Sequence, residues 1–171
     1  MIRNDRYGWF AIYTKSRHEK KVLERLTAKG IEAYLPLVPK ISQWKDRKKR
    51  VEEPVLRGYV FVKIDNQLRL PVLQTDGVVY FVKIGNSIPE IPEWQIEVLK
   101  TFVNKFGINV ELSGYKKFLL GEKVVVTDGA LKGVKGSVIA RGKKVRFAVG
   151  IDSIKSSFSV EIDPDFLKSI E

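Results

Sequence analysis

Gly58-Tyr59-Val60-Phe61-Val62-Lys63-Ile64 is the stretch of this sequence that most clearly predicts a β-strand. Successive side chains of a strand point to opposite faces. One face of the predicted strand is therefore aliphatic and is made of Val60, Val62 and Ile64. The other face carries Tyr59, Phe61 and Lys63.

The segments before this strand predict a strand, a helix and a second strand. Trp9-Phe10-Ala11-Ile12-Tyr13 is apolar, aromatic and β-branched, which is typical of a strand. The sequence Ser16-Arg17-His18-Glu19 has the form of a capping box. We therefore expect a helix over 16–29, with Gly30 at its C′ position. Residues 31–38 predict a further strand, at an edge of the sheet because Pro36 interrupts it.

The segments after the central strand predict further elements up to residue 106. Asn66 is the expected cap of a short helix that reaches Leu73. Residues 78–84 predict a fourth strand. Pro92 suits the first turn of a helix, and apolar residues follow it at helical spacing as far as Phe106.

The aromatic face of the central strand has two interpretations. The helices over 16–29 and 92–106 must bury their apolar sides, and the aliphatic face suits them. Tyr59 and Phe61 then lie on the opposite face, where Tyr13 can join them. Another element could cover this face, because aromatic side chains are usually buried. Alternatively, the face is a docking patch for a protein partner.

Residues 41–53 are polar and basic and predict a long loop or a ribbon. Trp44-Lys45-Asp46-Arg47-Lys48-Lys49-Arg50 contains five cations, one anion and one aromatic side chain. A solvated loop would explain such a run. We favour contact with a nucleic-acid backbone, because the run lies between two strands and Trp44 offers a stacking surface. The run has no base-reading pattern, so it predicts no sequence specificity.

Composition points to a polyanionic partner and excludes several chemistries. The 171 residues carry a net charge of +11, of which residues 1–60 carry +8. Nucleic acid is the first partner that this charge favours, and an acidic membrane surface is the second. The sequence has no cysteine and one histidine, His18, which excludes thiolate chemistry and histidine-rich metal sites. The carboxylates form no convincing cluster, so we expect no catalytic residue, metal or cofactor.

No long apolar segment is present, so we expect a cytoplasmic protein with no membrane association. Residues 1–6 lack the apolar core of a signal peptide. No run of about 18 apolar residues occurs that could span a membrane.

The last third of the chain predicts a small all-β domain. Periodicity stops over 107–118, which we interpret as a linker between a domain at 1–106 and a domain at 119–171. Short alternating strands follow, separated by glycines, and about fifty residues of this kind make a small barrel. The segment 121–138 lacks the G-K-[ST] ending of a phosphate-binding loop, so a nucleotide site is not expected.

The segment 121–138 resembles a KOW motif, G-E-x-V-x-V-x-x-G followed by G-x-x-G-x-V. The order of the strand Trp9–Tyr13, a basic helix, a basic ribbon and Gly58-Tyr59-Val60-Phe61-Val62 resembles an NGN domain. Together they are similar to the NusG family of transcription elongation factors. The resemblance implies an α+β N-terminal domain, with an antiparallel four-stranded sheet and flanking helices, and a small KOW barrel of SH3 type.

The resemblance also implies partners and binding residues. The N-terminal domain would bind the clamp of the largest RNA polymerase subunit through Tyr13, Leu56, Tyr59 and Phe61. DNA, as the upstream duplex or the non-template strand, would contact the basic residues Lys15, Lys21, Arg25, Lys45, Arg47, Lys48, Lys49 and Arg50. The protein would be a monomer. Its C-terminal barrel would recruit Rho or a small-subunit ribosomal protein. Its motif and factor-binding residues would be Gly121, Val124, Val126, Gly129, Leu131, Gly133 and Gly136.

Three departures favour a specialised paralogue that acts as an antiterminator on a particular long operon. Arg57 stands where a proline is common, the linker is short, and the net charge is high. Two other functions are alternatives that the sequence favours less. An RNA- or ribosome-binding KOW protein would need a basic and aromatic face on the barrel, whose region carries a net charge of only +4. A nuclease would need carboxylates clustered around a metal.

Overall fold

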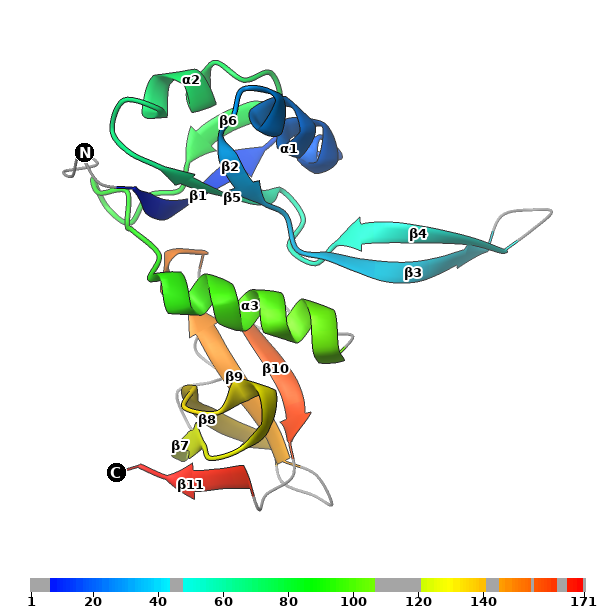
Figure 1. Cartoon of the computed structure of the whole chain (residues 1–171), viewed down its shortest axis with the longest axis vertical. Coiled ribbons are helices and arrows are strands. Elements are labelled where there is room, and N and C mark those ends of the chain that lie inside the picture. The colour runs from blue at the N-terminus through cyan, green and yellow to red at the C-terminus, as the bar shows by residue number, and fades with distance from the viewer. Residues whose placement is uncertain are drawn as a thin grey trace. The chain divides into compact units, whose positions relative to one another are not determined.

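The computed structural model describes residues 7–43, 48–106, 121–140, 145–154, 156–162 and 166–170 (Figure 1). The chain divides into two compact units, Met1–Ile96 and Glu97–Glu171. The expected linker at 107–118 lies outside the described residues. The domain limits predicted from the sequence therefore stay a prediction.

The first unit contains the predicted four-stranded antiparallel sheet. Its strands are β1 (Gly8–Thr14), β2 (Glu32–Tyr34), β5 (Tyr59–Ile64) and β6 (Val78–Phe81), and they lie in the order β2-β5-β1-β6. All three pairings are antiparallel. The strand predicted after Gly30 is β2, and it lies at an edge as expected. It ends before Pro36, which cannot donate a ladder hydrogen bond.

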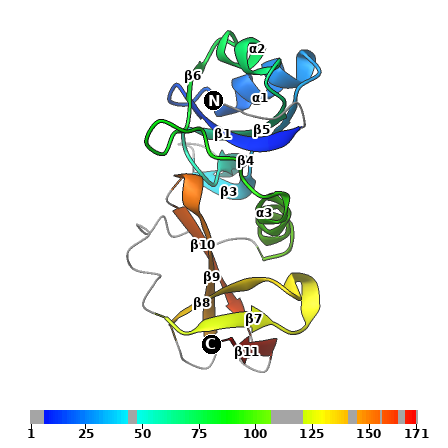
Figure 2. The same ribbon diagram turned by 90° about the vertical axis from the view of Figure 1, so that its left-hand side faces the viewer.

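Two helices cover one face of this sheet. Figure 2 shows α1 (Glu19–Ala28) and α2 (Arg69–Leu73) on the same side of β1 and β5. Val22, Leu26 and Val72 from these helices are buried in one cluster with the aliphatic side chains of β5, namely Val60, Val62 and Ile64. The alternation predicted for the central strand is therefore confirmed.

Helix α1 begins later than predicted, and the expected capping box is wrong. Its N-cap is His18, which makes no side-chain capping hydrogen bond. Arg17 has a φ of 60°, so the chain turns there and Ser16 does not lead into the helix. Glu19 is buried, and its Oε1 accepts a hydrogen bond from the Gly58 N–H at 2.7 Å. The carboxylate thus joins α1 to the start of β5 instead of capping its own helix.

The N-cap of α2 is Leu68, which makes no side-chain capping hydrogen bond, so the expectation that Asn66 caps this helix is wrong. Asp65 Oδ1 accepts hydrogen bonds from the N–H groups of Gln67 and Leu68, both at 3.0 Å. Asn66 contributes only its backbone oxygen, which accepts from the Arg69 N–H. The Asp65 carboxylate thus holds the turn that leads into α2, because it accepts from two backbone N–H groups ahead of the helix.

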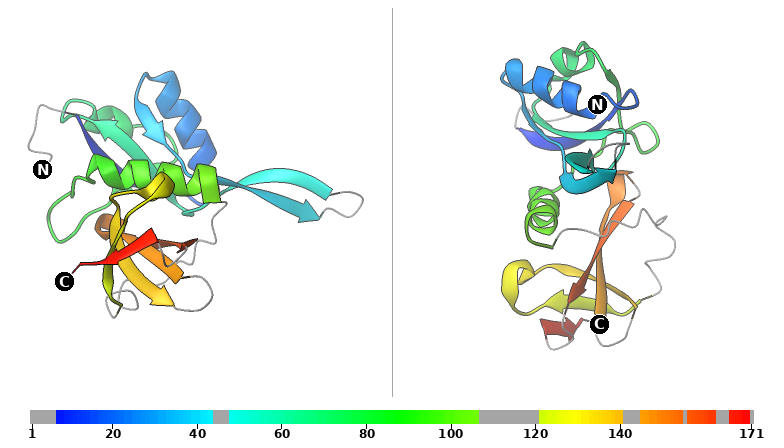
Figure 3. Two further views of the ribbon diagram at one scale, coloured as in Figure 1. Left: turned by 60° about the horizontal axis from the view of Figure 1, so that its bottom comes forward. Right: turned by 90° about the vertical axis from the view of Figure 1, so that its right-hand side faces the viewer.

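The basic segment forms a two-stranded antiparallel ribbon. Strand β3 (Leu37–Gln43) pairs with β4 (Lys48–Pro54) from Leu37 opposite Pro54 to Gln43 opposite Lys48. These seven pairs extend about 20 Å at the usual rise per residue. The ribbon is a sheet of its own and projects away from the four-stranded sheet (Figure 3). The prediction of a ribbon is confirmed for the described residues.

The helix predicted after Pro92 is α3 (Glu93–Phe106). Its start is fixed to the first unit by two contacts. The Ile91 N–H donates to the Trp9 oxygen at 2.8 Å, and Lys63 Nζ lies 2.7 Å from Glu93 Oε1. Ile96, Leu99 and Phe102 are buried, as the helical spacing predicted.

The second unit takes in α3 from Glu97 onward and contains, beyond this helix, the predicted all-β domain. It contains one antiparallel sheet in the order β10-β9-β8-β7-β11. The strands are β7 (Lys123–Val126), β8 (Lys135–Ala140), β9 (Val145–Ile151), β10 (Ser156–Ile162) and β11 (Leu167–Ser169). The last strand returns to pair with the first. Short 3₁₀ turns occupy Gly129–Leu131 and Asp152–Ile154.

The KOW residues have evident structural roles in this unit. Val124 and Val126 are buried on β7. Gly129 and Gly133 have φ values of 78° and 84°, a conformation that suits glycine. A Cβ at Gly121 or Gly136 would collide with the backbone oxygens of Val138 or Ala148 respectively. Each glycine of the motif is therefore required by the local backbone or by close packing.

The resemblance implies that Leu131 belongs to a factor-binding surface. In the structure this residue is buried instead. Its side chain is only 2% exposed. Leu131 is the last residue of the 3₁₀ turn at Gly129–Leu131 and is the buried residue of that turn. The expectation that Leu131 offers an exposed contact to another factor is wrong.

Candidate functional site

Three tyrosines from neighbouring strands form a cluster on the sheet face opposite α1 and α2. Tyr13 of β1 pairs with Tyr59 of β5 on one side and with Tyr80 of β6 on the other. The Tyr13 and Tyr59 rings meet edge to face with centroids 5.4 Å apart, and the Tyr13 and Tyr80 rings stack at 5.2 Å. Tyr80 is 48% exposed, and the other two are half-buried. We call Tyr13, Tyr59 and Tyr80 the tyrosine cluster.

Gly58 and Glu19 hold the tyrosine cluster in position. Gly58 has a φ of 82°, and a Cβ there would lie 2.8 Å from the Tyr13 ring. The Gly58 oxygen accepts from the Thr14 N–H at 2.8 Å, and the Gly58 N–H donates to Glu19. The backbone immediately before Tyr59 is thus fixed from both sides. This arrangement presents a rigid aromatic surface, which suits a protein interface.

The surroundings of Tyr59 disfavour its ionised form. Burial raises the pKa of the Tyr59 hydroxyl, and the neighbouring Tyr80 and Tyr13 raise it further. The hydroxyl therefore stays protonated at neutral pH and can donate a hydrogen bond to a partner.

Leu56 and Phe61 are not exposed members of this surface. Both have 0% exposed area. Phe61 lies on the same face as the tyrosine cluster, but it pairs with Ala11 and stacks on Tyr34 with centroids 6.4 Å apart. The expectation that Phe61 projects outward is therefore wrong, because alternation fixes the face of a side chain and not its exposure. Of the four implied docking residues, Tyr13 and Tyr59 retain exposed surface.

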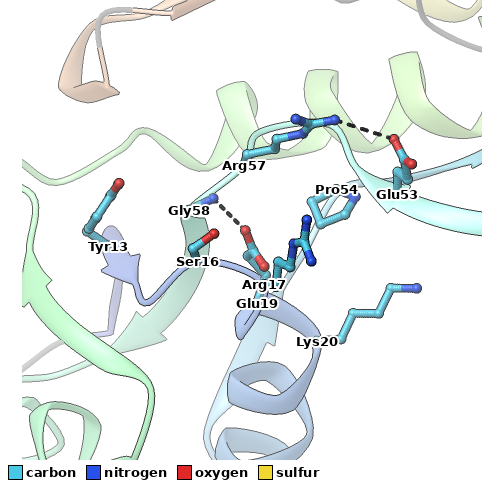
Figure 4. A pocket seen from close by; sticks show the side chains of 9 residues that line it. All are labelled: Tyr13, Ser16, Arg17, Glu19, Lys20, Glu53, Pro54, Arg57 and Gly58. Atoms are coloured by element: carbon cyan, nitrogen blue, oxygen red, sulfur yellow. Dashed lines mark hydrogen bonds and ion pairs between the residues drawn. The ribbon is translucent and has the colours of Figure 1, made fainter.

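A cleft lined by three cations and by the carboxylates of Glu19 and Glu53 adjoins the tyrosine cluster in the first unit. It has a volume of about 590 Å³. Figure 4 shows Arg17, Lys20 and Arg57 around it, with Tyr13 and Gly58 at one side. Arg57 Nη2 lies 3.8 Å from Glu53 Oε2, the oxygen that also binds Lys40 Nζ at 3.1 Å. Arg57, which departs from the family pattern, thus places a cation between the tyrosine cluster and the ribbon.

The implied DNA-facing cations on and before α1 are partly neutralised. Arg25 Nη1 lies 3.0 Å from Asp76 Oδ2, and Lys15 Nζ lies 3.5 Å from Asp76 Oδ1. Arg25 and Lys15 hold the pKa of the Asp76 carboxyl below its usual range. Lys21 is exposed on α1, four residues before Arg25. The structure therefore brings Lys15 and Arg25 together through an acid that the sequence did not identify.

Three cations lie toward the outer end of the ribbon, whereas Lys40 lies at its middle and pairs with Glu53. Lys48, Lys49 and Arg50 are all exposed on β4, whereas Glu52 and Glu53 lie nearer its base. Lys45 and Arg47 lie outside the described residues. An extended basic arm of this kind can follow a phosphate backbone.

Two residues of this region were missed by the sequence analysis. Tyr80 lay within a predicted strand, but only the strand order reveals that it stacks on Tyr13. Asp76 stands 51 residues from Arg25, and the sequence gives no signal for that pairing.

Among the described residues, no group of three or more carboxylates and histidines is arranged to hold a metal ion. In the same part of the chain, no helix combines the length and apolar character needed to span a membrane.

The NusG family model, described as "Transcription termination factor nusG", matches residues 7–100 of this chain. This match covers more than half of the 171 residues and includes the tyrosine cluster and the ribbon. It defines the chain as a transcription factor. The chain belongs to the NusG family.

A solved structure agrees in fold. The structure titled "Domain interaction in Thermotoga maritima NusG" matches with a TM-score of 0.55 and 21% identity, over 97% of this chain and 98% of that chain. Two structures of an MjSpt4:Spt5 complex, conformations B and A, match with TM-scores of 0.30 and identities of 16% and 17%. The matches cover 95% of this chain and 97% and 98% of those two chains. TM-scores of 0.30 do not support a shared fold. No curated protein sequence gave a match.

Proposed function

We propose that this chain is a transcription elongation and antitermination factor that binds RNA polymerase through its first unit. The observation that carries the proposal is the tyrosine cluster, an ordered aromatic surface in a NusG-family domain. Aromatic side chains are enriched at the centres of protein interfaces. The clamp of the largest polymerase subunit is the partner that the family implies for this surface.

DNA contact is the second part of the proposed function. The exposed cations Lys48, Lys49 and Arg50 extend from the first unit on the ribbon, and Lys21 is exposed on α1. Each phosphate that these cations neutralise releases counterions, so the contact should weaken with salt. The contact supports upstream duplex or non-template strand binding while the tyrosine cluster holds the polymerase.

The second unit would recruit a further factor, either Rho or a small-subunit ribosomal protein. Leu131 is buried, whereas Gly129 and Gly133 are exposed, so the two glycines of the turn stay part of the proposed factor-binding surface. The high charge and Arg57 support an operon-specific paralogue over a general factor. The alternative function is an RNA- or ribosome-binding protein with no polymerase role. That function would leave the tyrosine cluster without a partner.

Binding of the full chain to purified core RNA polymerase tests this proposal. Tyr80→Ala removes the most exposed ring of the tyrosine cluster and should weaken polymerase binding. Leu70→Ala is the matched control, because Leu70 is 60% exposed on α2, which covers the opposite sheet face. Equal binding by both variants and the native chain would remove the tyrosine cluster from the interface.

A further inference from the structure

Arg17 has a backbone conformation that lowers the stability of the fold. Its φ of 60° is the only positive value at a non-glycine residue in the described part of the chain. Arg17 is the third residue of a four-residue turn, which the His18 N–H closes on the Lys15 oxygen at 3.1 Å. Glycine usually occupies a turn position of positive φ, because a Cβ is strained there. The turn itself therefore gives no reason for an arginine at this position.

The side chain of Arg17 lies at the cleft beside the tyrosine cluster. Figure 4 shows Arg17, Lys20 and Arg57 around this cleft. Among the described residues, neither Arg17 nor Lys20 forms an ion pair. The Arg57 side chain is 78% exposed, and its contact with Glu53 is long at 3.8 Å. All three cations are thus accessible to an anion from outside the chain.

The two carboxylates that line the cleft already have other partners. Glu19 is buried and accepts a hydrogen bond from the Gly58 N–H at 2.7 Å. Glu53 Oε2 accepts from Lys40 Nζ at 3.1 Å. Of the described residues that line the cleft, no further carboxylate is left to neutralise the unpaired cations. The cleft therefore carries an excess of positive charge.

The cleft is continuous with the tyrosine cluster. Tyr13 lines the cleft, and its ring also contacts both other rings of the cluster, Tyr59 and Tyr80. Gly58, the residue before Tyr59, lines the cleft as well. A partner segment that covers Tyr13 therefore brings its neighbouring side chains to the cations of the cleft.

A carboxylate side chain is the anion that suits this cleft. The planar guanidinium of arginine binds a carboxylate through two parallel hydrogen bonds. A nucleic-acid backbone is also anionic, but the carboxylates of Glu19 and Glu53 would repel its successive phosphates. A single acidic side chain brings one negative charge, which the excess positive charge of the cleft neutralises.

We propose that Arg17, Lys20 and Arg57 bind an acidic side chain of the same RNA polymerase segment that covers the tyrosine cluster. The inference rests on the proposed function and adds the chemistry of the partner, an apolar contact for the rings with an Asp or Glu beside it. Arg17 is the cation that distinguishes an acidic partner from a neutral one, because a closed turn fixes its position.

Binding of the full chain to purified core RNA polymerase tests the inference through Arg17→Gly. Glycine relieves the strain at positive φ, so this variant should be at least as stable as the native chain in urea denaturation. It should nevertheless bind polymerase about tenfold more weakly, the loss expected for one hydrogen-bonded charge pair. Lys20→Ala should also weaken binding. A residue that served only the fold would lose stability and affinity together.

Lys83→Ala is the matched control, because Lys83 is an exposed cation of the first unit that does not line the cleft. It removes one charge and should leave the polymerase affinity as in the native chain. Native affinity in both Arg17→Gly and Lys20→Ala, or an equal loss in Lys83→Ala, would overturn the inference. Weaker duplex DNA binding by Arg17→Gly with unchanged polymerase affinity would also overturn it, since the cleft would then bind phosphate.

Tyr80→Ala separates a failure of this inference from a failure of the proposed function. If Tyr80→Ala weakens polymerase binding and the two cleft variants do not, the tyrosine cluster is the interface and only the cleft is refuted. If Arg17→Gly weakens binding and Tyr80→Ala does not, one segment does not cover both, and the inference is wrong in that form. If the native chain does not bind polymerase, the proposed function and the inference are both refuted.

Discussion

The contrast between Tyr59 and Phe61, two residues apart on one strand, makes the sharpest prediction about the first unit. Both lie on the face opposite α1 and α2, but Phe61 has no exposed area and Tyr59 is half-buried. Phe61→Ala should destabilise the unit by about 3–5 kcal/mol, the usual cost of removing a buried phenylalanine side chain. Tyr59→Ala loses the edge-to-face contact with Tyr13 and part of its buried area, about 1–2 kcal/mol.

The order should reverse for polymerase affinity. If Tyr59 is central to the interface, Tyr59→Ala should weaken binding by about 1–3 kcal/mol, which is roughly a 5- to 160-fold rise in Kd. Phe61→Ala should leave the affinity per folded molecule nearly unchanged, because its side chain does not reach the surface. Urea denaturation followed by circular dichroism gives the stabilities, and titration of labelled core polymerase gives the affinities.

Two results would refute this reasoning. If Tyr59→Ala unfolds the unit as readily as Phe61→Ala, then the tyrosine cluster is part of the core. If Tyr59→Ala is folded and binds polymerase normally, then the tyrosine cluster is not the interface. Val62→Ala serves as the reference for a change in the cluster beneath α1, because Val62 is buried on the opposite face of β5.

The remaining predictions concern charge, a buried hydrogen bond and a glycine. Replacing Lys48, Lys49 and Arg50 with alanine should flatten the slope of log K against log[salt] for duplex DNA by at most about 2.7, as measured by anisotropy. Asp76→Asn should raise DNA affinity at low salt by freeing Lys15 and Arg25, whereas Asp76→Glu should not. The pKa of Asp76 is lowered in the folded chain, so its ion pairs stabilise the fold above the unfolded pKa of about 3.9. This stabilisation is lost as the pH falls and the carboxylate is protonated. The stability of Asp76→Asn should therefore depend less on pH below about 4 than the stability of the native chain. Glu19→Ala should cost about 1–3 kcal/mol in urea denaturation because the buried Gly58 N–H loses its acceptor, and Glu19→Gln should retain most of the stability. Gly136→Ala should disrupt the second unit, seen as lost amide dispersion in its nuclear magnetic resonance spectrum, because its Cβ would collide with the Ala148 oxygen. Gly129→Ala should cost only about 1–2 kcal/mol, the strain of a Cβ at a φ of 78°, because nothing lies within 4 Å of the added atom.

Periodicity predicted the elements of the first unit well, because each element has a strong local signal. The alternation of Val60, Val62 and Ile64 identified the buried face of β5, and Gly30 marked the end of α1 through its φ of 72°. Family membership is confirmed over residues 7–100. These features depend on residues a few positions apart, which is the range that a local pattern records.

The errors arose where a distant residue competes with a local one. Glu19 matched a capping box, but the Gly58 N–H, 39 residues away, takes its carboxylate in a buried position. Phe61 matched an outward-facing aromatic residue, but Tyr34 and Ala11 from neighbouring strands lie against it. Leu131 matched an exposed turn, but it is buried. A local pattern states which face a side chain takes, and only the tertiary packing states whether that face is open.

Site-specific photo-crosslinking to RNA polymerase tests the central claim most directly. A photoreactive amino acid in place of Tyr80, the most exposed member of the tyrosine cluster, should crosslink the full chain to the clamp of the largest polymerase subunit. The same group in place of Leu70, exposed on the opposite side of the sheet, should give no such crosslink. A crosslink from position 70 and none from position 80, or none to polymerase from either position, would contradict the account.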